Sequence, residues 1–332
     1  MKAWTRRYCS GLAALVAPLV LTTAAAQPPP AAPDPAAAAR QAALNALPDS
    51  PGTGRFAARK EEVASLPNHV VYRPADLGAL GATKLGVVAW GNGGCSNNGA
   101  SSRFHLLELA SHGYLVIASG RILSGPGAPP AEARAPAPAG QPAPPRTAPT
   151  DLVAAIDWAL AENTRAGSEY FGRIDAGKVA LSGWSCGGLQ ALRVAADPRV
   201  VTVVMHNTGV LNGGPNTTIP GMDVTKDALA NFHTPVIYIM GGPTDIAYAN
   251  GMDDFARIAR VPVAIANLPV GHGGTFQEPN GGDAASVAVS WLDWQLRGDA
   301  AAARRFVGDN CGLCSDSKWQ FERRNFEKMP RG

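Results

Sequence analysis

A serine between two glycines lies near the middle of the chain, in the stretch VALSGWSCGGLQ (residues 179–190). Ser185 is the centre of a Gly-x-Ser-x-Gly pattern from Gly183 to Gly187, with an apolar run before it and a helical pattern after it. In that setting the pattern predicts a sharp strand-to-helix turn that presents the serine hydroxyl above a sheet. We therefore take Ser185 as a candidate nucleophile. The alternative is a glycine-rich turn that carries an incidental serine.

A serine hydroxyl needs a base to become a nucleophile, and the base needs an acid to orient it. In chains with this turn the order is Ser, then Asp or Glu, then His. The sequence has six histidines, and only His272, in the glycine-rich stretch LPVGHGGTF, follows a late acid. We expect His272 to be the base, the alternative being a histidine on a solvent-facing loop.

The acid must lie between Ser185 and His272, where the chain has six aspartates and no glutamate. Asp245 directly follows the stretch PVIYIMGGPT, at the expected carboxyl end of a strand. We therefore choose Asp245. Asp253 is the second choice, because it begins a helical run in which an acid favours the helix dipole.

Strand and helix patterns alternate along the chain from about residue 69. Val/Ile-rich runs without polar alternation predict parallel strands that are covered on both faces, at residues 69–74, 84–91, 114–120, 178–183, 200–206, 235–241 and 261–268. Helical patterns lie at residues 102–113, 150–163, 186–197 and 286–299, and Thr150 is the expected N-cap of the second. The alternation predicts an α/β fold with a mostly parallel central sheet and helices on both faces.

The N-terminus has the pattern of a secretory signal peptide over residues 1–26. Lys2, Arg6 and Arg7 precede a short apolar run, and Ala24 to Ala26 offer a small-residue cleavage site. The apolar run is shorter than the roughly 20 residues that a membrane span needs. We expect a secreted or periplasmic protein, cleaved near Ala26, with no membrane span in its mature form.

Charge and motifs exclude some kinds of partner. The formal net charge is +3, and the predicted signal peptide carries three basic and no acidic residues, so the mature chain is formally neutral. A basic surface for nucleic acid is therefore not expected. The sequence has no H-E-x-x-H, EF-hand or P-loop motif, so we expect no metal and no cofactor.

Composition divides the rest of the chain. Residues 27–67 read as an Ala/Pro-rich leader and residues 68–332 as a single domain. Within that domain, residues 121–149 carry nine prolines. Such a stretch buries too little apolar surface to order itself, and it follows a strand, so it should leave the sheet at the carboxyl edge where ligands bind. It is expected to be a disordered insertion or, alternatively, a mobile flap over the site.

At this point the sequence resembles the α/β-hydrolase superfamily, over roughly residues 68–300. The serine turn, Gly241 to Asp245 (GGPTD) and Gly271 to Gly274 (GHGG) occur in the order and at the strand ends that this family uses. The stretch GGPTDIAY also resembles the acid loop of cutinase-like polyester hydrolases and of dienelactone-hydrolase-like esterases.

Two further motifs resemble those of a group of secreted hydrolases: WGNGGC, from Trp90 to Cys95, and SCGG, which begins at Ser185. The resemblance implies a serine esterase that cleaves carboxylic esters through an acyl-enzyme. Trp184 and Cys186 depart from cutinases, which usually have His and Met around the serine. Narrower alternatives are a polyester, lipid-ester or cell-wall acyl-ester hydrolase. A catalytically silent binding protein on the same fold is a further alternative.

Acyl transfer also needs fixed N–H donors that face the developing oxyanion. One donor should be the backbone N–H of Cys186, the residue after the nucleophile. The resemblance suggests Asn92 as the second donor, with Gly93 as the alternative. We expect the substrate pocket to be lined by Trp90, Gly93, Trp184 and Asn207, although a packing role for Trp184 is equally compatible with the sequence.

Four cysteines remain after removal of the signal peptide, an even number that suggests disulfides in an exported protein. If the N–H groups of Asn92 and Cys186 serve one oxygen, a Cys95–Cys186 disulfide would join their segments. Cys311 would then pair with Cys314, unless the C-terminal pair is instead bonded to the body of the domain. A zinc site at these two cysteines lacks a second ligand pair.

Overall fold

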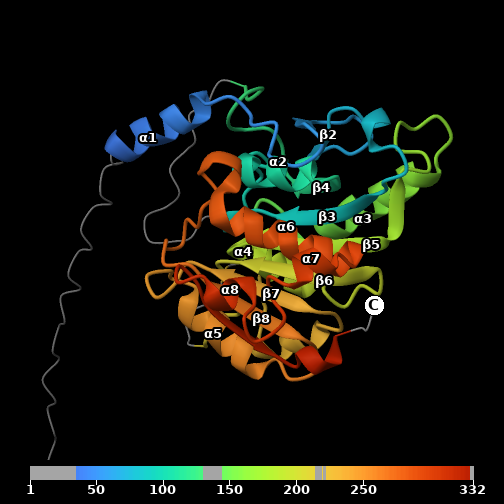
Figure 1. The fold of residues 1–332 in the computed structure, drawn as a ribbon. Helices are drawn as coiled ribbons and strands as arrows, with labels where there is room; N and C mark the ends of the chain where they lie inside the picture. The colour runs from blue at the N-terminus through green and yellow to red at the C-terminus, as the bar shows by residue number, and fades with distance from the viewer. Residues whose placement is uncertain (1–34, 130–143, 214–218, 220–221, 330–332) are drawn as a thin grey trace, which may run out of the picture. The chain divides into compact units, whose positions relative to one another are not determined.

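A nine-stranded sheet runs through the described part of the computed structural model, which covers residues 35–129, 144–213, 219 and 222–329 (Figure 1). The spatial order of the strands is β1-β2-β4-β3-β5-β6-β7-β8-β9. The six strands from β4 to β8 in this order pair in parallel, and β1, β2 and β9 pair antiparallel at the two edges. The strand bounds are β1 Ala58–Glu61, β2 His69–Pro74, β3 Leu85–Gly91, β4 Tyr114–Ser119, β5 Ile174–Trp184, β6 Val200–His206, β7 Val236–Met240, β8 Val263–Asn267 and β9 Gln320–Arg324.

Helices cover both faces of this sheet. Every residue of β3 is buried, and alternate side chains enter different cores. Val87 and Ala89 pack with α3 (Pro149–Thr164) and α4 (Cys186–Arg193), whereas Val88 and Trp90 pack with α2 (Arg103–Ser111) and α6 (Gly282–Arg297). The remaining helices are α1 Pro35–Ala46, α5 Tyr248–Arg257, α7 Ala300–Ala303 and α8 Gly312–Ser315. The prediction of an α/β fold with a mostly parallel central sheet is confirmed.

Each of the seven predicted strands and four predicted helices has a counterpart in the structure, with bounds that differ by a few residues. The predicted N-cap Thr150 is wrong, because α3 already begins at Pro149. Proline is well suited to the first turn of a helix, where its missing N–H has no intrahelical partner. The cap position is Ala148, whose N–H donates to the Asp151 side chain at 2.8 Å.

The folded part begins earlier than the sequence patterns predicted. Residues 35–67 were expected to belong to a leader, yet α1 and β1 lie there, and Phe56 and Leu66 are buried. Strand β1, with the sequence ARKE, pairs through its backbone with β2. An edge strand of this kind needs no apolar alternation, and charged side chains are common on it. The predicted signal peptide and residues 27–34 lie outside the described residues.

Both ends of the predicted proline-rich insertion are fixed in the structure. Arg121 forms a β-bridge with Asn98. At the other end, the N–H groups of Arg146 and Thr147 donate to the Cys95 carbonyl at 2.8 and 3.1 Å. The prediction of disorder therefore fails for these flanks, and residues 130–143 lie outside the described part.

Within residues 35–129, 144–213 and 222–329, none of the helices combines the length and apolar character needed to cross a membrane.

Candidate active site

The turn at Ser185 connects the end of β5 to the first residue of α4. Its backbone has φ 54° and ψ −121°, a conformation that is costly for a residue other than glycine. Contacts on both sides hold it: the Ser185 N–H donates to the His206 carbonyl at 2.9 Å, and the Thr208 hydroxyl donates to the Ser185 carbonyl at 2.7 Å. The turn thus presents the serine side chain at the carboxyl edge of the sheet.

Glycines bring three backbone segments into contact around this turn. A Cβ atom on Gly187 would overlap the backbone of Gly91 and Asn92, and a Cβ on Gly183 would overlap the Gly187 carbonyl. The end of β3, the end of β5 and the first turn of α4 therefore pack without side chains between them. This explains why the pattern needs glycine on both sides of the serine.

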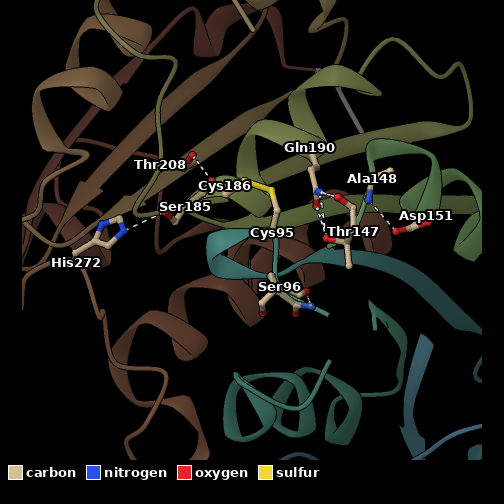
Figure 2. Close-up of a disulfide and its surroundings, with 11 residues drawn as sticks. Cys95, Ser96, Thr147, Ala148, Asp151, Ser185, Cys186, Gln190, Thr208 and His272 are labelled. Atoms are coloured by element: carbon tan, nitrogen blue, oxygen red, sulfur yellow. Dashed lines mark hydrogen bonds between the residues drawn. A yellow bond between two sulfur atoms is a disulfide. The ribbon is translucent and has the colours of Figure 1, made fainter. Parts of the chain in front are cut away.

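Ser185, His272 and Asp245 form a hydrogen-bonded series. His272 Nε2 lies 3.0 Å from Ser185 Oγ, and His272 Nδ1 lies 2.6 Å from Asp245 Oδ1 (Figure 2 shows the Ser185–His272 contact). The three residues follow β5, β7 and β8, whose carboxyl ends meet at one edge because these strands are parallel. The structure thus brings together the three residues predicted to act in catalysis.

Asp245 is buried, with 3% of its surface exposed. Burial alone would raise its pKa, but hydrogen bonds outweigh it and hold the pKa of this carboxyl below its ordinary value. Besides His272, the donors are the N–H groups of Ala247 and Gly241, at 2.8 and 3.1 Å, and the Asn207 amide, at 2.9 Å. Asp245 is therefore ionised at neutral pH and fixes the orientation of the His272 ring.

The second-choice acid, Asp253, is placed elsewhere. It lies within α5 rather than at its start, and it forms ion pairs with Arg257 and Lys226, both at 2.8 Å. Hydrogen bonds from these two cations lower its pKa to about 2. Asp253 therefore belongs to a surface ion-pair network and, within the described part of the chain, forms no hydrogen bond or ion pair with His272.

Asn207 was predicted to line the pocket, and it does so. It also has a role that the sequence did not reveal. Its side-chain amide bridges Asp245 and the Gly271 carbonyl, the latter at 3.1 Å, and so links the acid to the loop that carries His272. Its backbone has φ 43°, in the left-handed region that asparagine tolerates better than most residues. Asn207 is therefore a positioning residue as well as part of the pocket wall.

Trp90 does not line the pocket, contrary to the prediction. It is fully buried and packs against His105, His206 and Phe276, in the core on the α2 and α6 face of the sheet. Its indole N–H donates to the Asn92 side chain at 3.1 Å. The strand alternation places Trp90 on the face of the sheet opposite α4, so it cannot reach a pocket that α4 lines.

Trp184 contacts His272 and Gly93 contacts Trp184, but neither residue belongs to the pocket lining. The Trp184 indole N–H donates to the His272 carbonyl at 2.9 Å, and its ring packs on Phe276. A Cβ on Gly93 would overlap the Trp184 ring. The packing alternative for Trp184 is thus the one that the structure supports, and Trp184 steadies the loop of His272.

A small pocket of about 130 Å³ opens beside Ser185. The sequence patterns did not identify eight residues of its lining, which are Leu189, Thr208, Gly209, Leu211, Ile219, Ile246, Ala247 and Asn250. Its described lining residues include no Asp, Glu, Lys or Arg. Ile246, directly after Asp245, is 80% exposed at the rim. The pocket therefore offers an apolar, uncharged surface next to Ser185.

The two candidate oxyanion segments are covalently joined. Cys95 and Cys186 form a disulfide between residues 91 positions apart in sequence, with a Cα–Cα distance of 5.2 Å. Cys186 is the first residue of α4, so its N–H has no partner within the helix. The prediction of this pair is confirmed, as is that of the second disulfide, between Cys311 and Cys314.

The candidate donor Asn92 has a fully buried side chain that builds the loop after β3. Its amide donates to the carbonyls of Ser96 and Ser119, at 2.9 and 2.6 Å. Its backbone nitrogen lies against the first turn of α4, since a Cβ on Gly187 would overlap it. The side chain of Asn92 thus fixes the loop, and its backbone nitrogen lies close to the helix that begins at Cys186.

Among the described residues, no group of three or more His, Cys, Asp or Glu side chains is arranged to hold a metal ion. The chain matches no protein-family model, and no curated protein sequence is similar to it. The function must therefore be inferred from the geometry of the site.

Proposed function

We propose that the protein is a secreted serine hydrolase with the α/β-hydrolase fold, which cleaves carboxylic esters through an acyl-enzyme on Ser185. The observation that carries this proposal is the continuous hydrogen-bonded series from Ser185 Oγ through His272 to the buried Asp245 carboxylate. The strained turn at Ser185 supports it further, since such strain persists where the surrounding structure fixes it and is concentrated at active sites. A silent binding protein would have no need of this arrangement.

In the proposed reaction, His272 Nε2 takes the proton from Ser185 Oγ as the oxygen attacks the ester carbonyl. The carbonyl oxygen becomes an oxyanion that accepts hydrogen bonds from Cys186 N–H and from the N–H of Asn92 or Gly93. The imidazolium then protonates the leaving alcohol, and the acyl group remains on Ser185. Water attacks the acyl-enzyme with His272 again as base, which releases the acid and restores the serine.

Asp245 contributes by holding the imidazole in one orientation and by stabilising the imidazolium that forms in both steps. Its lowered pKa keeps it negatively charged while His272 is protonated. Each oxyanion donor of this kind is typically worth about 3 to 4 kcal/mol of transition-state stabilisation.

The pocket favours esters with a compact, uncharged acyl group. Its volume of about 130 Å³ is close to that of a cavity of about 150 Å³ that holds benzene. A charged acyl group would lose its hydration there without gaining an ion pair. The exposed Ile246 at the rim favours one narrower alternative, an apolar ester presented by a polymer or lipid. The two disulfides support the export that the N-terminal pattern predicts.

Hydrolysis of p-nitrophenyl esters tests the proposal, with Ser185→Ala beside the matched variant Ser317→Ala, which alters an exposed serine. We expect Ser185→Ala to lower kcat by at least about a thousandfold and Ser317→Ala to leave it unchanged. Equal rates in the two variants would remove Ser185 from the mechanism. An acyl series from acetyl to palmitoyl, together with a succinyl ester, would then define the pocket.

A further inference from the structure

The loop that carries the second oxyanion donor has an unfavourable backbone. Gly94 and Cys95 both have positive φ, 62° and 45°, directly after Asn92 and Gly93. A left-handed conformation is tolerated by glycine but is costly for cysteine. Such a conformation persists only where contacts from outside the loop fix it. What holds Cys95 therefore also determines where the N–H groups of Asn92 and Gly93 point.

Two different segments hold Cys95. Its sulfur is bonded to Cys186 at the start of α4. Its carbonyl accepts two hydrogen bonds, from the N–H groups of Arg146 and Thr147, at 2.8 and 3.1 Å. The segment before α3 therefore holds the Cys95 carbonyl in place, provided that the segment is itself fixed.

Gln190 fixes that segment. Its side-chain amide donates hydrogen bonds to the Thr147 carbonyl, at 2.7 Å, and to the Thr147 hydroxyl oxygen, at 3.1 Å. Gln190 is fully buried, and Thr147 is 8% exposed. A buried amide with these partners is expensive to remove, because the Thr147 carbonyl would be left unsatisfied.

Gln190 and Cys186 are four residues apart on α4, and so lie on the same face of the helix. Figure 2 shows both contacts beside each other: Cys186 reaches Cys95 directly, and Gln190 reaches it through Thr147. The contacts close a ring from α4 through Thr147 to Cys95 and back to α4. Helix α4 therefore holds the loop after β3 in two ways, through the disulfide of Cys186 and through the hydrogen bonds of Gln190.

We propose that Gln190 is a positioning residue for the oxyanion site, which acts through Thr147 and Cys95 on the N–H groups of Asn92 and Gly93. This inference rests on the proposed ester hydrolysis. Gln190 does not touch the substrate. It keeps the second N–H donor directed at the oxyanion that forms above Ser185. Loss of the Gln190 side chain therefore reduces the stabilisation of the transition state and leaves the affinity for the substrate largely unchanged.

The test is Gln190→Met, which keeps the length of the side chain but forms no hydrogen bond to Thr147. Its matched control is Gln295→Met, on the half-buried part of α6. The rates are expressed per active site, after titration with a fluorophosphonate. We expect Gln190→Met to lower kcat/KM for p-nitrophenyl butyrate about 10- to 100-fold, while KM changes by no more than about threefold.

A trifluoromethyl ketone provides the second readout, because its adduct with the serine carries an oxyanion. We expect its Ki to rise in Gln190→Met by the same factor as kcat/KM falls. A merely structural role would reduce the titratable fraction of the protein and leave both values per active site unchanged. That result, or a Ki within about twofold of the wild type, would overturn the inference.

A second pair of variants covers the case in which Gln190→Met does not fold. Thr147→Val removes the hydroxyl that Gln190 meets, and Thr147→Ser keeps it. We expect kcat/KM to fall several-fold in Thr147→Val and to be restored in Thr147→Ser. Equal values in these two variants would contradict the inference. If the wild type hydrolyses no ester and does not react with the fluorophosphonate, both the proposed function and this inference fail. If the wild type is active and Gln190→Met is equally active, only the inference about Gln190 is overturned.

Discussion

His272 and the nearby pair of His105 and His206 differ in burial and in the hydrogen bonds of their rings. His272 lies half-buried at the carboxyl edge, and both of its ring nitrogens are paired, one with Ser185 and one with Asp245. His105 and His206 lie fully buried beneath it, with ring centroids 4.8 Å apart. In the described structure none of their ring nitrogens has a hydrogen-bond partner.

The difference shows that proximity to Ser185 alone does not give a histidine ring the partners that a base would need. The His206 carbonyl accepts the Ser185 N–H, yet the His206 ring packs against Trp90 and Phe276. Burial lowers the pKa of His206 well below its usual value, and His105 lowers it further. His206 therefore serves the site through its backbone, whereas His272 serves it through its ring.

The largest difference between the two kinds of histidine should appear when the imidazole of His272 is removed. We expect His272→Ala to lower kcat by at least about a thousandfold, because the proton of Ser185 then has no acceptor. His233→Ala, at an exposed histidine, is the matched control and should keep full activity. Steady-state hydrolysis of p-nitrophenyl butyrate measures both, and activity retained in His272→Ala would exclude it as the base.

The next test concerns the partner that distinguishes His272 from the buried pair. Asp245→Ala should lower kcat about 100- to 10,000-fold, since the ring loses its orientation and its counter-charge. Asp253→Ala removes the second-choice acid and disturbs only the ion pairs with Lys226 and Arg257. It should stay within about twofold of the wild type. If Asp253→Ala were the inactive variant, the assignment of the acid would be wrong.

The third test compares the two disulfides, which differ in what they join. The Cys95–Cys186 bond spans 91 residues and the Cys311–Cys314 bond spans three. Chain entropy predicts a loss of about 4 to 5 kcal/mol for Cys95→Ala/Cys186→Ala and under about 2 kcal/mol for Cys311→Ala/Cys314→Ala. Urea unfolding measures both.

The two disulfides should also differ in their effect on kcat. At a temperature where both variants are folded, only the first should also lose kcat, by about 10- to 100-fold, because it frees the oxyanion loop. Equal kinetic effects in the two variants would show that the Cys95–Cys186 bond has no special relation to the site.

The smallest expected effect is the pH dependence of stability that the buried pair produces. Burial lowers the pKa of His105 to about 3, and nearby Glu108 only partly opposes this. The unfolded chain binds a proton at this imidazole below about pH 6.5 and the folded chain does not, so the stability that it contributes is lost as the pH falls from about 6.5 towards 3.

Urea unfolding at pH 7.5 and pH 5.0 measures this loss. We expect the wild type to lose on the order of 2 kcal/mol more than His105→Leu between these two values. The exposed variant His233→Ala should behave as the wild type does. The same loss in all three proteins would mean that His105 is not kept neutral by burial.

Ser185, Asp245 and His272 are brought together as the sequence predicted, and the arrangement of the strands explains why. Ser185, Asp245 and His272 each follow an apolar strand, and parallel strands must bring such residues to one edge. Two neighbouring loops that are proposed to serve one oxyanion must also meet, which is why the Cys95–Cys186 pair could be anticipated. These features depend on local patterns and on chain order.

What the sequence did not predict depends on contacts between distant segments. Trp90 was assigned to the pocket because its motif is next to the oxyanion loop, but strand alternation turns it to the other face. The edge strands β1 and β9, with the sequences ARKE and QFERR, each carry a single apolar side chain that packs on the core, Ala58 and Phe321, which is too little for an apolar strand pattern. The contact of Gln190 with Thr147 joins α4 to the segment before α3, which no local motif connects.

Covalent trapping of the nucleophile tests the central claim most directly. The full-length protein would be incubated with a fluorophosphonate, and the modified peptide would be identified by mass spectrometry, with Ser185→Ala and His272→Ala treated in the same way. The account predicts one adduct, on Ser185, that is absent from Ser185→Ala and forms far more slowly in His272→Ala. An adduct on another serine, or a wild-type protein that is not modified at all, would contradict it.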